Sequence, residues 1–316
     1  MSKGKRGSMA YQISHFAVSD EKRSKHGVGS IAEKTAKQYY KHTLRFANWC
    51  KDACGIKDFT KCGAYLQDYS NYMVQEGMSA STIHTYLAGP CHYFEVPLEE
   101  IKKPKRYCAE NKRSRRTTKS DARKDTQREA SPRLWDFASA VGVRRYEYQR
   151  LRCDDLVHDE SGYLCVRIMR GKGGKFQLQR ILPEDEAFVQ GMFDGTGEYV
   201  FTEEEMKNKQ DLHALRDKLA RRAYAYYLER IKEEGRDKLI AEIKLRWKLY
   251  CDKPFNRSLI RMKPYRIRGR NKKKAEANGL PLEYDRLALL AVSVFHLSHW
   301  RLSVTVSNYM LAVEAP

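Results

Sequence analysis

The chain has 316 residues, enough for two ordinary domains, and its apolar content of 41% is typical of a globular protein. No apolar run approaches the roughly 20 residues that cross a bilayer, and the first residues lack the apolar stretch of a signal peptide, so we expect a soluble cytoplasmic protein. The formal net charge of +20 indicates a polyanionic partner; nucleic acid is the first candidate, with a basic protein lacking such a partner as the alternative.

The first part of the chain predicts a small helical domain over residues 29–100. Residues 1–28 are polar and basic, and we expect them to form a flexible tail. A Ser/Glu capping box opens a helix over 30–50, and a second helix is expected over 61–75. A third helix begins near 79, and its Gly-Pro pair is expected to break or kink it.

A basic linker is expected over residues 101–130. A stretch this charged cannot bury apolar area. Two interpretations stay open for this segment: a solvated spacer and, because of its positive charge, a strap that follows DNA phosphates. The expected DNA contacts are Lys102, Lys103, Lys105, Arg106, Arg113, Arg115 and Arg116 in the linker, together with Lys175 further along the chain.

The second domain, residues 131–316, is expected to be mainly helical with one β-hairpin. Two runs of alternating polarity flank a glycine-rich turn, which is the pattern of a hairpin. The expected elements in chain order are a helix over 131–142, a short helix around 146–151, strands over 163–169 and 176–182, a long helix over 212–234, a very basic stretch over 257–278, and a helical segment from 284 that breaks near His299.

Local signals in this domain are each common when taken alone, as surface ion pairs, exposed turns or core histidines. An arginine at a helix start presents a rigid fork of donors that suits a phosphate. The Gly-Lys-Gly-Gly-Lys turn over 171–175 lacks the spacing of a phosphate-binding P-loop. His213 and Arg216 share one helix face, and Tyr309 follows His299 by ten residues.

In this order, six residues resemble the catalytic set of the tyrosine recombinase (phage-type integrase) family: Arg144, Lys172, His213, Arg216, His299 and Tyr309. The local matches are GVRRYE over 142–147, the GKGGK turn with RILP behind it, HALR over 213–216 and the tail HWRLSVTVSNY. The tail is most similar to integrases of bacterial integrative and conjugative elements. The resemblance implies a mainly α fold with a small β-sheet, in which a helical, SAM-like core-binding domain and a catalytic domain form a two-domain, C-shaped clamp.

By this resemblance, Tyr309 attacks the scissile phosphate and forms a 3′-phosphotyrosyl bond. Arg144 and Arg216 stabilise charge on the non-bridging oxygens, as preorganised donors do. The covalent bond stores the phosphodiester energy, so the reversed chemistry joins strands without ATP, cofactor or metal. The implied activity is site-specific recombination that integrates or moves a mobile element.

The remaining roles are also implied by the resemblance. Lys172 protonates the departing 5′-oxygen, His213 is the acid/base for the nucleophile, and His299 donates a hydrogen bond to the phosphate. Glu147 is expected to orient Arg144. Ser298 stands where the family usually has glycine, which changes the freedom of the backbone before His299.

The expected partner is double-stranded DNA, with a homotetramer in the synapse, accessory DNA-bending or directionality proteins, and a bacterial or phage source with the protein near the nucleoid. Two alternatives keep the same fold: a type IB topoisomerase-like relaxase, and a non-catalytic DNA-binding regulator. A metal-dependent nuclease requires clustered carboxylates, and no convincing cluster occurs. The eight cysteines lack zinc-ligand spacing and are expected to be reduced.

Overall fold

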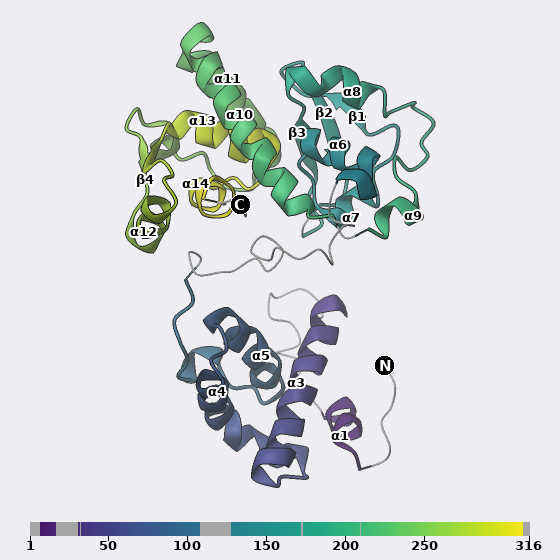
Figure 1. The fold of residues 1–316 in the computed structure, drawn as a ribbon, viewed down its shortest axis with the longest axis vertical. Coiled ribbons are helices and arrows are strands. Elements are labelled where there is room, and N and C mark those ends of the chain that lie inside the picture. Colours follow the sequence, from purple (N-terminus) through teal and green to yellow (C-terminus); the bar gives the residue numbers. More distant parts are fainter. Residues whose placement is uncertain are drawn as a thin grey trace. The chain divides into compact units, whose positions relative to one another are not determined.

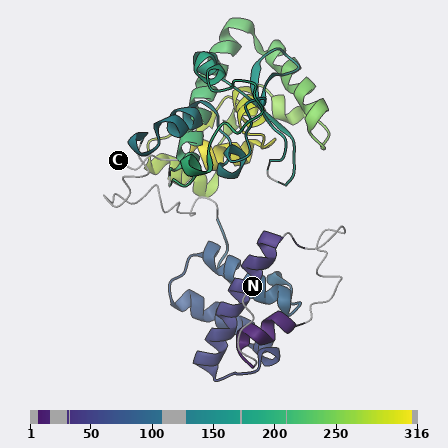
Figure 2. The same cartoon turned by 90° about the vertical axis from the view of Figure 1, so that its right-hand side faces the viewer.

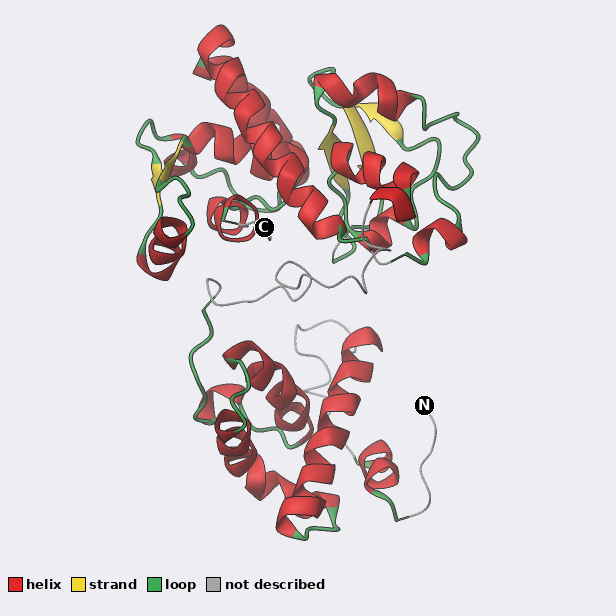
Figure 3. Ribbon diagram, viewed as in Figure 1, coloured by secondary structure: helices red, strands yellow, loops and turns green. Residues whose placement is uncertain are grey.

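The computed structural model describes residues 7–16, 31, 33–107, 128–171, 173–208 and 210–311. The chain divides into two compact units, Met1–Asn111 and Lys112–Pro316 (Figure 1). Helices predominate, and the described strands form small antiparallel sheets in the second unit (Figure 3). None of the described helices combines the length and apolar character that crossing a bilayer requires.

The first unit is a helical bundle. Its elements are α1 (Met9–His15), α3 (Glu33–Cys54), the 3-10 helix η1 (Phe59–Tyr65), α4 (Leu66–Gln75), α5 (Ala80–Tyr93) and the 3-10 turn η2 (Leu98–Glu100). The long helix α3 packs against α5 and α1. Phe46, Phe59, Met73 and Ile83 have no exposed surface, so one continuous core holds these helices together.

The N-terminal segment differs from the expected flexible tail. Residues 9–15 form α1, and Ser8 caps this helix by accepting a hydrogen bond from the Tyr11 N–H. Met9 and Ile13, four residues apart, are buried in the core of the unit. The prediction of a tail over 1–28 is therefore wrong for α1, because two apolar residues on one helix face suffice to bury it. The predicted Ser30 cap lies outside the described residues.

Helix α5 is not broken at its Gly-Pro pair, one of the two predicted outcomes, since it continues through Gly89 and Pro90 to Tyr93. Gly89 faces α3 so closely that an added Cβ would lie 2.5 Å from the carbonyl oxygen of Tyr39. The close packing of the two helices keeps α5 in place where local preference alone would break it.

The second unit is mainly helical with two small sheets. Its helices are η5 (Arg128–Ala130), α6 (Pro132–Ala140), α7 (Arg145–Tyr148), η6 (Pro183–Asp185), α8 (Glu186–Gln190), α9 (Glu203–Met206), α10 (Leu212–Glu234), α11 (Arg236–Tyr250), η7 (Arg257–Ile260), α12 (Gly269–Ala277), α13 (Arg286–Ala291), the π-helical η8 (Val292–His296), α14 (Leu302–Thr305) and the π-helical η9 (Val306–Met310). Its strands are β1 (Leu156–His158), β2 (Leu164–Ile168), β3 (Gln177–Arg180), β4 (Tyr265–Arg266) and β5 (Glu283–Tyr284).

The predicted hairpin is confirmed as β2 and β3, which pair antiparallel with Cys165 opposite Arg180. The turn between them is closed by the Gly171 N–H, which donates to the Lys175 carbonyl at 2.8 Å. Strand β1 adds to the other edge of β2, and β4 pairs with β5. These three short strands were not predicted, because two or three residues cannot display an alternating pattern.

Helix α10 joins the two apolar cores of the second unit. Its first turns place Leu212 and Leu215 in the core shared with α6, α7 and the sheet. Further along, Leu219 and Tyr227 belong to the core shared with α11, α13, η8 and η9. The C-terminal segment, yellow in Figure 2, lies within the surrounding helices of the unit. Arg216 therefore lies where the two cores meet.

Candidate active site

Tyr309 and His299 are in direct contact. Tyr309 lies in η9 with 8% of its surface exposed. Its hydroxyl oxygen is 2.7 Å from Nε2 of His299, and the tautomer of the histidine decides which atom donates. A phenol in this position can pass its proton to a neutral imidazole, and the resulting phenolate can take it back from the imidazolium.

Arg216 lies beside this pair, on α10. Its side chain is buried, and the guanidinium carbon is 5.6 Å from the centroid of the Tyr309 ring. Nη2 donates to the carbonyl oxygen of Leu297 at 2.7 Å, whereas Nε and Nη1 have no hydrogen-bond partner within the described part of the chain. Two buried donors next to a tyrosine hydroxyl are suited to the oxygens of a phosphate.

Burial and the neighbouring residues shift the pKa of the Arg216 guanidinium. Burial lowers the pKa of its guanidinium, the nearby Tyr309 hydroxyl acts in the opposite direction, and the positive charge of Arg144 lowers it further. Arginine nevertheless stays protonated in proteins. Arg144 and Arg216 thus form a pair of close cations, for which an anion between them would relieve the repulsion.

Arg144 is held by Glu147, as the sequence predicted. Arg144 is the N-cap of α7, and its backbone N–H donates to Glu147 Oε2 at 2.7 Å. Its Nη1 donates to Oε1 of the same carboxylate at 2.9 Å. Tyr146 donates its hydroxyl to Oε1 as well. The carboxylate is fully buried and Arg144 keeps 14% exposure, so one face of the guanidinium is fixed and the other can reach a ligand.

Gly142 lies where the segment before Arg144 packs against α10. A Cβ at this position would lie 2.9 Å from Leu219 Cδ2 and 3.2 Å from Arg216 Cγ. The absence of a side chain lets the segment before Arg144 pack directly against α10. The sequence marked this glycine only as the end of a helix.

The loop before His299 has an unusual backbone. Ser298 and Trp300 both adopt left-handed conformations, with φ of 50° and 58°. The loop is fixed by Ser293, whose carbonyl accepts from the His299 N–H at 3.0 Å and whose Oγ accepts from the Arg301 N–H at 3.0 Å. Trp300 packs edge-on against Trp247 at 5.2 Å. Glycine adopts a left-handed φ without steric cost, which explains why it suits position 298. Ser298 adopts the same φ here although it carries a Cβ.

The two remaining predicted catalytic residues are His213 and Lys172. His213 is exposed in the first turn of α10, one turn before Arg216. Lys172 lies outside the described residues. Its neighbour in the turn, Lys175, is exposed and pairs with Asp252 at 2.6 Å. The structure thus brings together Arg144, Arg216, His299 and Tyr309 out of the six predicted residues.

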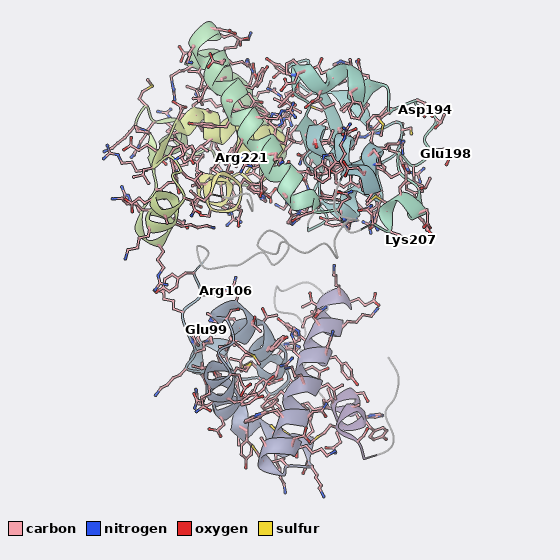
Figure 4. All side chains as sticks on the ribbon, in the orientation of Figure 1. Glu99, Arg106, Asp194, Glu198, Lys207 and Arg221 are labelled. Carbon is pink, nitrogen blue, oxygen red and sulfur yellow. The ribbon has the colours of Figure 1, made fainter. Side chains whose placement is uncertain are left out.

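The predicted DNA contacts of the linker are described only in part. Lys102, Lys105 and Arg106 are exposed, and Arg106 is labelled in Figure 4. Lys103 instead directs its ammonium at the carbonyl oxygens of Leu98 and Ile101. The remaining three, Arg113, Arg115 and Arg116, lie outside the described residues.

Within the described ranges, no group of three or more His, Cys, Asp or Glu side chains could hold a metal ion. None of the seven described cysteines forms a disulfide bond.

Comparisons with known proteins give likenesses among solved structures but not among protein families. Neither protein-family models nor curated proteins match the chain. Among solved structures, the crystal structure of XerA recombinase is similar over 60% of this chain and 77% of its own, with 14% identity and a TM-score of 0.21. A likeness at this TM-score and identity says nothing about the activity of the present chain.

Proposed function

We propose that this protein cleaves and rejoins DNA strands with Tyr309 as the nucleophile, as a site-specific recombinase does. The observation that carries the proposal is the contact of the Tyr309 hydroxyl with His299, 2.7 Å away, beside the buried guanidinium of Arg216. The order of the six residues in the sequence, which resembles the tyrosine recombinase family, supports the same chemistry.

The proposed reaction is an in-line displacement at phosphorus. The phenolic oxygen of Tyr309 loses its proton and bonds to phosphorus, while the bond from phosphorus to the 5′-oxygen breaks and that oxygen takes up a proton. The free donors of Arg216 and the exposed face of Arg144 would stabilise the charge that develops on the non-bridging oxygens. Lys172 is the proposed donor to the 5′-oxygen. Attack of a 5′-hydroxyl on the phosphotyrosyl bond then rejoins a strand.

The contact between His299 and Tyr309 refines the proton transfer. The sequence resemblance gives His213 the role of acid/base and His299 a hydrogen bond to the phosphate. Because Nε2 of His299 is the imidazole nitrogen that meets the Tyr309 hydroxyl, His299 is the better placed of the two to accept the phenolic proton. His213 then remains a candidate for the hydrogen bond to the phosphate, or for proton transfer in the rejoining step.

The substitution Tyr309→Phe tests the proposal. On a nicked suicide substrate, whose cut strand cannot be rejoined, the wild type should accumulate a covalent protein–DNA adduct visible on a denaturing gel. Tyr309→Phe should give none, and the exposed Tyr199→Phe should behave as the wild type. If the wild type forms no adduct on substrates carrying its own element's ends, the proposed chemistry is lost and a DNA-binding regulator is favoured.

Recombination also requires partners. We propose duplex DNA held by both units, and a homotetramer when two duplexes are joined. Strand exchange between paired substrates distinguishes this from a relaxase, which would relax supercoils without exchanging strands.

A further inference from the structure

A strongly basic pocket lies in the segment between Arg216 and His299. The pocket has a volume of about 480 Å³ and is formed around β4, the segment that precedes it and the start of α12. Its charged lining residues are all cations, namely Arg261, Lys263, Arg266, Arg268 and Arg286. No carboxylate contributes to the lining, so the pocket concentrates positive charge in a concave surface.

Several of these cations are available to a ligand. Arg266 pairs with Glu283 at 2.6 Å, and Arg286 uses Nε to donate to the Lys263 carbonyl at 3.1 Å. Arg261, Lys263 and Arg268 are exposed, and none of them forms an ion pair with another residue that the structure describes. Like charges gathered without counter-charges repel one another, and an anion in the pocket would remove that repulsion.

The start of α12 borders the same pocket through Arg268 and Asn271. Arg268 is the N-cap of this nine-residue helix, and its side chain makes no capping hydrogen bond to the first-turn N–H groups. The first turn contains no acidic residue, and Asn271 from this turn lines the pocket. N–H groups at a helix start carry partial positive charge and bind phosphate groups well.

The pocket is joined to the segment that carries Tyr309. Val306, the first residue of η9, lines it, and Asn271 Nδ2 donates to Ser307 Oγ at 3.0 Å. Tyr309 follows two residues after Ser307 in η9. Whatever occupies the pocket therefore touches elements that also position the candidate nucleophile.

We propose that this pocket binds a backbone phosphate of duplex DNA, distinct from the phosphate that Tyr309 would attack. Guanidinium forks and helix N–H groups recognise phosphate oxygens without reading bases. The pocket thereby anchors the DNA next to η9. The inference rests on the proposed function only in taking DNA as the ligand.

The test measures DNA binding apart from cleavage. The full chain carrying Tyr309→Phe is titrated with a random-sequence duplex at several KCl concentrations. Two further substitutions, Arg261→Gln and Arg268→Gln, remove two pocket charges. The matched control, Lys244→Gln with Lys248→Gln, removes two exposed charges from α11. Thermal unfolding of each variant verifies the fold, and inorganic phosphate is titrated as the competing small ligand.

The pocket variant should bind duplex on the order of tenfold more weakly, with a salt slope smaller by about one, because each neutralised phosphate contributes about 0.9 to that slope. The control should change the affinity less than about twofold. Equal losses in both double variants would overturn the inference. So would binding of inorganic phosphate that the pocket substitutions abolish while duplex affinity stays unchanged, since the pocket would then hold free phosphate. Failure of the wild type to form a covalent adduct would remove the proposed chemistry and leave this comparison intact.

Discussion

Arg216 is a charged side chain in a position where proteins usually bury apolar ones. Leu215 and Leu219, its neighbours on α10, belong to two different apolar cores. A buried guanidinium with two donors lacking partners among the described residues costs free energy. Proteins accept such costs mainly where the group acts on a ligand, which fits a phosphate beside Tyr309.

The substitution Arg216→Lys tests this interpretation. Lysine keeps the charge but loses the planar fork, so we expect DNA cleavage to slow by about 10²- to 10³-fold, the usual effect of losing one oxyanion donor. DNA affinity should change only a few-fold, because in the proposed complex Arg216 is one of many phosphate contacts. Single-turnover cleavage and binding titrations measure the two effects. Arg222→Lys, on the same helix but paired with Asp185 at the surface, is the control; equal loss of binding and cleavage in Arg216→Lys would contradict the assignment.

The burial of the His296 imidazole predicts how the free energy of unfolding depends on pH. Burial and, to a smaller extent, the charges of Arg180 and Arg246 together lower its pKa to about 3. The unfolded chain takes up this proton near pH 6.5, whereas the folded chain does not. The contribution of His296 to stability is therefore complete above pH 6.5. It is lost progressively as the pH falls toward 3, at about 1.4 kcal/mol per pH unit.

Urea unfolding at pH 7 and pH 5 measures this effect. The free energy of unfolding should fall by about 2 kcal/mol more in the wild type than in His296→Gln, because only the wild type carries the buried imidazole. Glutamine can keep the hydrogen bond to the Tyr227 hydroxyl, which is 3.1 Å from Nε2 in the wild type. An identical pH dependence in both proteins would show that His296 is protonated in the folded state.

At the scale of elements, a buried ion-pair network joins the sheet to α11. Asp159 Oδ2 accepts from Arg180 Nε at 2.6 Å and from Arg246 Nη2 at 2.5 Å. Glu242 accepts from Arg180 Nη1 at 2.7 Å. Burial raises the pKa of Asp159, but the two guanidiniums outweigh it and hold the pKa below its usual range. The network fixes β3 against α11, and through them the position of α10.

We expect Asp159→Asn to destabilise the second unit by about 3–5 kcal/mol, because it removes the buried carboxylate that Arg180 and Arg246 share and leaves each of them with a single acidic partner. Glu229→Gln removes one partner of an exposed pair with Lys232 and should cost less than about 1 kcal/mol. Urea unfolding monitored by tryptophan fluorescence compares the two variants. Similar costs for both would mean that the network contributes no more than a surface pair.

The helices also show which structural features local sequence patterns can predict. The bounds predicted for α10, 212–234, are confirmed. Asp211 caps its start by accepting from the N–H groups of His213 and Ala214, and Gly235 follows its end with a φ of 81°. Such signals lie within a few residues and can be read from the sequence. The left-handed Ser298 and the continuous α5 depend on packing and cannot.

At the scale of the whole molecule, the net charge of +20 favours binding of a polyanion such as the proposed DNA. We expect the dissociation constant for duplex DNA to rise steeply between about 50 and 200 mM salt, with a slope of at least about 4 on logarithmic axes if five or more phosphates are neutralised. Replacing the exposed Lys102, Lys105 and Arg106 by glutamine should lower that slope by up to about 3. A salt response that is flat, or unchanged in this variant, would remove the linker from the binding surface.

The sequence by itself determined a basic, mainly helical chain, the hairpin of β2 and β3, the limits of α10, and the order of six residues that resembles a recombinase. Tertiary structure decided that Arg216 and Tyr309, 93 positions apart in the chain, lie side by side, and that His299 is the histidine in contact with the tyrosine hydroxyl. It also buried α1 and formed the basic pocket beside η9. Local conformational preferences act over a few residues, whereas the contacts of a site arise when distant helices bury their apolar faces together.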